Sequence, residues 1–194
     1  MNSYPQIRTS ADLLKSTIRI EELIPFLQQQ KAEACAIVNS KLYGLLPFWQ
    51  AVKKAGIHPV VGLKVHVHYE NSTLPVILYA KTNEGYKNLL KITSGISIRD
   101  DELLPFRWLL GYSKGLAIVI PILEEEGIWL EEENKEILFQ INKTFEDVLI
   151  GISRAGGHVS PFEDKAISIS NLLNCSVMAI HECLFLKPED HFAF

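Results

Sequence analysis

Residues 42–65 read LYGLLPFWQAVKKAGIHPVVGLKV and predict a helix, a stop signal and a strand in immediate succession. Over 43–56 the pattern of apolar residues favours an amphipathic helix. Gly56 can end this helix as a C-terminal cap, because glycine adopts the left-handed conformation without strain. The run that follows, 59–67, is rich in β-branched residues and is typical of a strand. The stretch therefore predicts one repeat of an α/β fold.

The same alternation continues on both sides of this stretch. With 59–67, the predicted strands are 4–8, 34–38, 74–80, 116–120, 147–152 and 176–180. Helical patterns lie near 18–30, 83–96, 101–111, 131–145 and 161–173. Pro25 should kink the first of these or start a turn, and Asn83 can cap the start of the second. About seven strands in mostly βα order predict an α/β protein with a parallel sheet or barrel.

Size and charge limit what the chain can be. Its 194 residues, 47% of them hydrophobic, suffice for one compact domain with a sizeable core. The net charge of −4 gives no overall positive field for gripping a nucleic acid backbone. The three cysteines, Cys35, Cys175 and Cys183, have no metal or disulfide spacing and favour a reducing compartment, the cytoplasm. No signal peptide or long apolar run occurs, so we expect neither secretion nor a membrane partner.

Two stretches carry a more specific pattern, namely 42–65 and AKTNEGYKNLLKITS at 80–94. They resemble the N-terminal PHP domain of bacterial DNA polymerase III alpha subunits of the DnaE type. That family tends to read MYG, FY-x-A-x-K-x-x-GI-x-PI-x-G and then LLAK-x-x-x-GY-x-NL-x-K-x-S. The matching residues are Tyr43, Gly44, Phe48, Trp49, Ala51, Lys53, Gly56, Ile57, Pro59, Gly62, Ala80, Lys81, Gly85, Tyr86, Asn88, Leu89, Lys91 and Ser94. Weaker matches at 10–14, 108–115 and 184–190 extend the resemblance over nearly the whole chain.

The resemblance implies a fold and a context. The family fold is a distorted seven-stranded (βα) barrel, in agreement with the strand count above. Family proteins are much longer, so we expect residues 1–194 to be a single PHP domain, a fragment of a polymerase subunit. The whole protein would be a DNA-directed DNA polymerase, a nucleotidyltransferase of DNA replication. Its core domains are the expected partners, other replisome subunits are further candidates, and DNA would be bound only through the full-length polymerase.

The metal-binding motifs of the family are missing. In metal-binding PHP domains, histidines and carboxylates at strand ends hold divalent ions that hydrolyse phosphoesters, because such ions acidify a bound water and hold phosphoryl oxygens. The corresponding residues are Gln6-Ile7-Arg8 for H-x-H, Lys15 for the next aspartate, Val38-Asn39-Ser40 in either register for T-D-H, Lys64 for the glutamate, Pro75 for a further histidine and Glu182-Cys183-Leu184 for D-x-H. Only Glu182 keeps a side chain that can bind a metal ion.

Positive charge replaces the expected ligands. At ~4 Å and an effective dielectric of ~20, each pair of like unit charges costs roughly 4 kcal/mol, and a dication doubles this. Arg8, Lys15 and Lys64 therefore oppose a metal cluster. We expect no catalytic, metal-binding or cofactor-binding residues and no cofactor. Instead, Arg8 and Lys64 would fill the former site as cations, paired with Glu182 or Asp12.

Two pairs of residues that include histidine offer weaker candidates. His66 and His68 are two residues apart on a predicted strand, so they share one face. We interpret them as half-exposed strand residues, and the alternative is an adventitious zinc site with Glu70. His181 and Cys183 are the second pair, since a thiol beside an imidazole can be a nucleophile. No third residue that would orient this pair is evident.

Other features are interpreted as structural. His58, His158 and His191 are read as surface residues, and Gly156-Gly157-His158 is too short for a phosphate loop. The acidic run at 124–136 is read as a solvated helical face with Ile128, Trp129 and Leu130 turned inward.

Three functions are compatible with these features. The first is a catalytically silent PHP domain that packs on the polymerase core and stabilises it. The second is a metal-dependent phosphoesterase or 3′–5′ exonuclease that proofreads, which would need the ligands that are missing. The third is an interaction module with an exposed patch of Trp49, Phe106 and Trp108, although core packing is the simpler interpretation of each.

Overall fold

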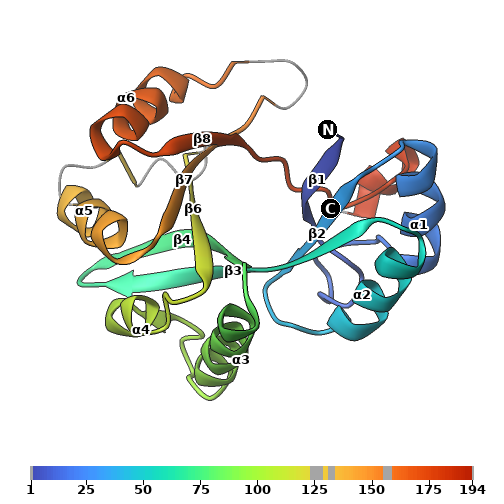
Figure 1. Cartoon of the computed structure of the whole chain (residues 1–194), viewed down its shortest axis with the longest axis horizontal. Helices are drawn as coiled ribbons and strands as arrows, with labels where there is room; N and C mark the ends of the chain where they lie inside the picture. The colour runs from blue at the N-terminus through green and yellow to red at the C-terminus, as the bar shows by residue number, and fades with distance from the viewer. Residues whose placement is uncertain (1, 123–128, 131–133, 155–158, 194) are drawn as a thin grey trace. The chain divides into compact units, whose positions relative to one another are not determined.

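The computed structural model describes residues 2–122, 129–130, 134–154 and 159–193 (Figure 1). The strands are β1 (Ser3–Ile7), β2 (Ala34–Asn39), β3 (His58–Tyr69), β4 (Ser72–Ala80), β5 (Leu104–Pro105), β6 (Leu116–Pro121), β7 (Asp147–Ile152) and β8 (Ser176–Ala179). The helices are α1 (Ile20–Gln29), α2 (Leu45–Lys54), α3 (Asn83–Ser97), α4 (Phe106–Gly111), α5 (Lys135–Thr144) and α6 (Glu163–Leu173), followed by a 3₁₀ segment, η4 (Pro188–Ala193). None of the described helices is both long and apolar enough to cross a membrane.

All seven predicted strands are present within two residues of their expected limits, and β5 is an additional two-residue strand. The helix expected at 101–111 is shorter than predicted, because 104–105 pair with β3 before α4 begins. Helix α1 continues through Pro25 instead of stopping there. Gly56 follows α2 with a φ of +77°, and its amide donates to the carbonyl of Lys53, which confirms its predicted role as a cap.

The strand order β1-β2-β3-β4-β6-β7-β8 departs from an all-parallel sheet at one strand. Strands β1, β2 and β3 pair in parallel, and so do β6, β7 and β8. Strand β4 pairs with β6 in the antiparallel direction. The reason is the short turn at 70–71 between β3 and β4, because a connection of this length can join only antiparallel strands.

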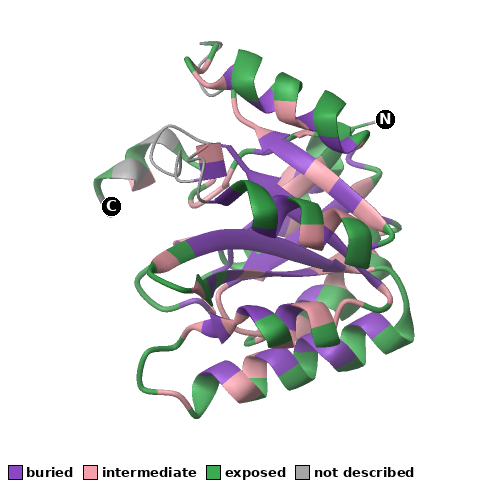
Figure 2. Ribbon diagram, turned by 90° about the vertical axis from the view of Figure 1, so that its left-hand side faces the viewer, coloured by how far each residue is buried: buried purple, intermediate pink, exposed green. Residues whose placement is uncertain are grey.

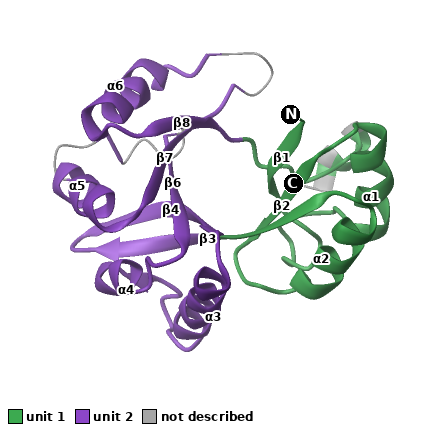
Figure 3. Ribbon diagram, in the orientation of Figure 1, with its two compact units in different colours: residues 1–63, 181–194 green, residues 64–180 purple. Residues whose placement is uncertain are grey.

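The described chain forms two compact units (Figure 3). The first unit comprises 1–63 and 181–194, and the second comprises 64–180. In the first unit, Leu23 and Leu27 of α1 and Phe48 and Val52 of α2 are buried in one apolar core with strand residues such as Ile37. Each helix thus buries one apolar stripe, which Figure 2 shows as purple bands on otherwise exposed helices.

The GY-x-N motif at the start of α3 has a structural role in the second unit. The hydroxyl of Thr82, and not Asn83 as expected, caps α3 by accepting a hydrogen bond from the amide of Gly85 at 3.1 Å. A Cβ at Gly85 would overlap the carbonyl oxygen of Gly115. The side chain of Asn88 donates to the carbonyl of Lys114 at 2.9 Å. The motif therefore holds the start of α3 in contact with the turn that precedes β6.

Candidate functional site

Several positions of the missing metal motifs come together at the carboxyl ends of β1 and β2, whereas Lys64 and Pro75 belong to the second unit. The segment that follows β8 runs beside β1, because Ile7 and Cys183 form a parallel bridge. The amide of Arg8 donates to the carbonyl of Cys183 at 3.1 Å, and the amide of Cys183 donates to the carbonyl of Gln6 at 2.9 Å. Residues that are far apart in the sequence, Arg8 and Glu182, are thereby placed in one cluster of the first unit.

Arg8 is the centre of this cluster. It is only 7% exposed. One of its terminal nitrogens, Nη1, lies 2.9 Å from Oδ2 of Asp12, and the other, Nη2, pairs with the carboxylate of Glu182. The predicted pairing of Arg8 with Asp12 and Glu182 is therefore confirmed. The predicted contribution of Lys64 stays a prediction, because Lys64 belongs to the second unit.

Asp12 extends the network from β1 to the end of β2. Its Oδ2 accepts a hydrogen bond from the amide of Ser40 at 2.8 Å, and its Oδ1 accepts one from the Ser40 hydroxyl at 2.6 Å. The carboxylate of Asp12 is thus bound by a guanidinium and by two neutral donors. Such charge-assisted hydrogen bonds are stronger than neutral ones, and they fix the loop after β1 against the loop after β2.

Asn39 makes a second connection between the same loops. Its side-chain oxygen accepts from the amide of Thr9 at 2.9 Å, and its Nδ2 donates to the Thr9 hydroxyl at 3.1 Å and to the Tyr43 carbonyl at 3.2 Å. Ser16 adds a third connection, since its hydroxyl bonds to the carbonyls of Arg8 at 2.7 Å and Leu184 at 2.9 Å. Sequence reasoning missed Asn39, Ser40 and Ser16 as site residues, although polar residues at a buried strand end are a usable signal.

This arrangement does not fit the metal cluster of the fold family. A buried guanidinium lies among the carboxylates that a dication would need, and Lys15 replaces a further ligand. Among the described residues, no three His, Cys, Asp or Glu side chains are grouped so that they could hold a metal ion. The carboxylates of Asp12 and Glu182 are paired with Arg8. The cluster therefore cross-links the loops that carry these residues.

His66 and His68 are exposed residues on one face of β3, while the alternating residues Val65 and Val67 are buried. The interpretation of both histidines as exposed residues of a strand is confirmed. They do not form a three-residue ligand group with Glu70 within the described part of the chain. His58 is also exposed, as expected, whereas His158 and the side chain of His191 lie outside the described residues.

The nucleophile alternative for Cys183 gains no support from its surroundings. Its sulfur lies 3.8 Å from the carbonyl oxygen of His181. Burial, and next the negative charge of Glu182, raise the pKa of the Cys183 thiol, which disfavours the reactive thiolate. Cys35 is more deeply buried, and burial raises the pKa of its thiol to about 12.

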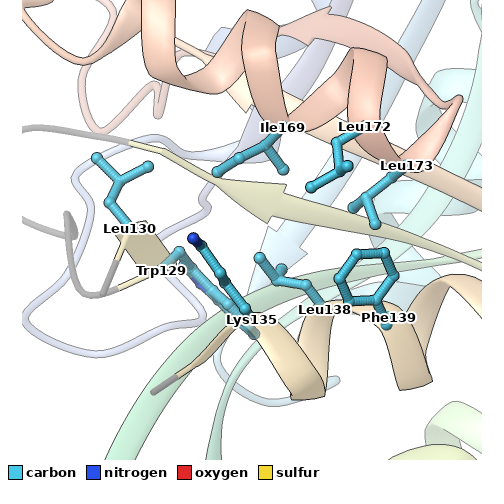
Figure 4. Close-up of a pocket in the computed structure, with 8 residues that line it drawn as sticks. All are labelled: Trp129, Leu130, Lys135, Leu138, Phe139, Ile169, Leu172 and Leu173. Carbon is cyan, nitrogen blue, oxygen red and sulfur yellow. The ribbon is translucent and has the colours of Figure 1, made fainter. Parts of the chain in front are cut away.

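The acidic run falls mostly outside the described residues, including Ile128, so its helical face stays a prediction. Trp129 within it is buried, as expected, and its indole nitrogen donates to the carbonyl of Pro75 at 2.9 Å. A small cleft of about 40 Å³ adjoins Trp129 (Figure 4). The residues that line it come from the segment before α5, from α5 and from the end of α6; they are Trp129, Leu130, Lys135, Leu138, Phe139, Ile169, Leu172 and Leu173. With Lys135 as its single ionisable residue, the cleft offers no acid–base pair.

The aromatic patch proposed for an interaction module does not form from the named residues. Phe106 is buried and stacks edge-on against Tyr69, with ring centroids 5.1 Å apart. Trp108 packs on Gly95, where a Cβ would meet its ring. Trp49 belongs to the first unit and lies under the ammonium group of Lys53 at 4.4 Å. Core packing is therefore confirmed for Phe106, and the three rings are distributed over both units.

Comparison with known proteins defines the class. The sequence profile described as "PHP domain" matches residues 6–155, so the chain belongs to the PHP domain family.

Two solved structures share the fold. An amidohydrolase from Chromobacterium violaceum superposes with a TM-score of 0.62 at 12% identity, covering 98% of this chain and 89% of that one. A two-domain protein from Bacteroides vulgatus that contains a predicted PHP-like metal-dependent phosphoesterase gives 0.63 at 9%, covering 95% and 52%. The predicted fold class, α/β of the PHP type, is confirmed.

The particular relatives are polymerase subunits. DNA polymerase III subunit alpha of Bacillus subtilis (strain 168) is 33% identical over 206 residues, which cover 97% of this chain and 18% of that protein. The subunit of the same name from Staphylococcus epidermidis (strain ATCC 12228) is 36% identical over 120 residues, which cover 61% and 11%. The resemblance inferred from the sequence motifs is confirmed. The chain spans less than a fifth of the length of these relatives.

Proposed function

We propose that this chain is the PHP domain of a bacterial DNA polymerase III alpha subunit and acts as a catalytically silent scaffold for the polymerase core. The family match and the alpha-subunit relatives support the context. In the whole protein, template-directed DNA synthesis would be carried out by residues outside this chain, whose core domains are its partners. Residues 1–194 form a single PHP domain in this proposal.

The ion-pair cluster at Arg8 is the observation that supports a catalytically silent role. A guanidinium lies at a family histidine position and is bonded to the two carboxylates nearest to it, Asp12 and Glu182. A dication at that position would face the repulsion of a buried positive charge and would have to displace it. We therefore expect these residues to cross-link β1, β2 and the segment after β8.

A first experiment separates this proposal from the phosphoesterase or exonuclease alternative. The metal content of the purified protein is measured, followed by hydrolysis of bis(p-nitrophenyl) phosphate in the presence of Mn²⁺ or Zn²⁺. We expect no stoichiometric metal at the Arg8 cluster and no turnover above the metal-only blank. Stoichiometric metal together with turnover would establish the alternative.

A second experiment addresses the scaffold role. Residues 1–194 are deleted from the intact protein that carries them, and thermal unfolding and primer extension are compared with those of the undeleted protein. We expect the deletion to lower both the melting temperature and the polymerase activity. Unchanged melting and activity would contradict a scaffold function.

We also propose a cytoplasmic location. The observation behind it is that all three cysteines, Cys35, Cys175 and Cys183, are free thiols. Free thiols are typical of reducing compartments. Labelling of the protein in fractionated cells tests this proposal, and recovery from an extracytoplasmic fraction would contradict it.

A further inference from the structure

Two loops of the first unit expose large apolar side chains. Leu13 is 82% exposed and Leu14 is 94% exposed in the loop after β1, while Tyr43 is 62% and Leu46 is 65% exposed at the start of α2. Single exposed apolar residues are ordinary, but several in adjoining loops mark a surface that another polypeptide covers.

The two loops lie side by side. A Cβ at Gly44 would come within 2.5 Å of the Cβ of Ala11, so the backbone of the second loop touches the first. Asp12 accepts hydrogen bonds from Ser40, and Asn39 donates to the carbonyl of Tyr43. The exposed residues immediately follow or precede these contacts, namely Leu13 and Leu14 after Asp12 and Tyr43 and Leu46 on either side of Gly44.

Hydrogen bonds hold the loop that carries Leu13 and Leu14 in a defined conformation. The amide of Ser10 donates to the carbonyl of Ile18 at 2.8 Å, which closes the base of the loop. Within it, the amide of Asp12 donates to Thr9 at 2.9 Å, and the amide of Lys15 donates to Asp12 at 3.1 Å. A surface that is already ordered loses less conformational entropy when a partner binds, which favours association.

Leu14 combines two unfavourable properties. Its φ is +60°, a left-handed conformation in which a leucine side chain is strained and which glycine or asparagine adopts more readily. Its side chain is also almost fully in water. Since asparagine would remove both disadvantages, the presence of leucine indicates that the apolar side chain itself is required.

The charges around these residues indicate the character of the partner. Residues 9–19 and 40–50 contain three basic residues, Lys15, Arg19 and Lys41, and a single acidic one, Asp12, which is buried in its ion pair. The chain as a whole is acidic, so this basic border is local. Aliphatic leucines cannot stack on bases in the way that aromatic side chains do. An apolar protein surface bordered by carboxylates fits these loops best.

We propose that Leu13, Leu14, Tyr43 and Leu46 form the surface by which this domain docks onto the remainder of its own polymerase subunit. This inference rests on the function proposed above. The occupant follows from the function proposed above, since the B. subtilis relative matches this chain over only 18% of its sequence, and in a subunit of that length most of the protein would be attached to this domain. A covalently attached partner has a high effective concentration, so a small apolar surface suffices.

The test uses the intact protein with the double substitution Leu13→Ser and Leu14→Asn. Ile98→Asn is the matched control, because Ile98 is 83% exposed but lies in the second unit. Hydrogen exchange at 10–17 and 41–46 is measured together with thermal unfolding. We expect the double variant to lose protection at these amides and its first unfolding transition to fall by roughly 4 °C or more. The control should match the parent protein in both measurements.

The other outcomes are distinguishable. If the double variant matches the parent protein while deletion of 1–194 still lowers stability, the docking surface is overturned and the scaffold function stands. If neither change has an effect, both are overturned. A loss of DNA affinity at an unchanged melting temperature would show that these loops bind nucleic acid. A change of molar mass in light scattering would show that they bind a second copy of the chain. Either result overturns the docking proposal.

Discussion

Arg8 holds acidic groups from separate segments of the first unit together with one side chain. A guanidinium presents its donors in a fixed planar fork, so it binds two carboxylates in defined directions and cannot lose its charge. In this chain the two carboxylates are Asp12, four residues away, and Glu182, near the opposite end of the sequence.

Replacing Arg8 with methionine tests how much this cluster stabilises the fold. Methionine retains much of the side-chain volume but leaves Asp12 and Glu182 without their cation, and removing one member of a buried pair costs about 3–5 kcal/mol. We expect the free energy of unfolding in urea to fall by about that amount. Lys187→Met is the control, because the exposed pair of Lys187 with Glu22 is 3.7 Å apart and such pairs contribute only ~0–1 kcal/mol. Equal effects of the two substitutions would refute the special role of Arg8.

The thiols give a second prediction at the residue scale. Burial raises the pKa of Cys35 and, together with Glu182, that of Cys183, so few thiolates are present at neutral pH. We therefore expect Ellman's reagent to modify both residues much more slowly in the native protein than in urea at pH 7.5. Labelling followed by peptide mass spectrometry measures each site separately. Rapid native labelling of Cys183 would restore the nucleophile interpretation.

Residue identities predicted this site only in part. The loss of ligands and the pairing of Arg8 with acidic residues follow from motif positions and from charge. The hydrogen bonds of Asn39 to Thr9 and of Ser16 to Leu184 join residues 30 and 168 positions apart. Such contacts depend on how the chain ends meet, and no local pattern encodes them.

Among the elements, the start of α3 depends on the absence of a side chain at Gly85. Gly85→Ala would drive a methyl group into the carbonyl of Gly115, and overpacking of this kind costs roughly 1–3 kcal/mol or more. We expect a clear fall in melting temperature. Gly111→Ala is the matched control, since no atom lies within 4 Å of the added Cβ. A melting temperature for Gly85→Ala as high as for the control would show that α3 packs differently.

Helix α6 provides a pH-dependent prediction. Arg154 forms two hydrogen bonds with the carboxylate of Glu163 in the first turn of the helix, and this contact lowers the pKa of Glu163 below its ordinary value of 4.5. A lowered folded-state pKa stabilises the fold above the ordinary value, and the contribution disappears as pH falls through the folded-state pKa. Glu163→Gln should therefore lower the melting temperature at pH 7, and its melting temperature should approach that of the parent as pH falls through the lowered folded-state pKa of Glu163. A difference in melting temperature between the variant and the parent that persists or widens as the pH is lowered would contradict this assignment.

The elements were more predictable than their pairing. β-branched runs and amphipathic spacing located seven strands and most helices, because these patterns are local. The reversed direction of β4, which follows from the short turn at 70–71, was not predicted. The pairing of β5 with β3 was not predicted either, since it depends on which strand edge the segment meets. The cap of α3 was misplaced by one residue because threonine and asparagine are both good caps and stand side by side.

For the whole molecule, the motif pattern identified the family and the fold that the comparisons then showed. What the sequence could not supply was the surface offered to other domains, because exposure is a property of the folded chain. The exposed residues Leu13 and Leu14 and the buried Arg8 are close together in the sequence of the first unit. The ion pair of Arg8 with Asp12 also helps to fix the loop that is proposed to dock.

The most direct test of the central claim is anomalous scattering from crystals of this protein soaked in Mn²⁺. If Arg8 and its two carboxylates replace the metal cluster, no anomalous peak should occur beside Asp12 and Glu182, and the guanidinium should remain bonded to both. A peak bridging these carboxylates, with Arg8 displaced from them, would contradict the account.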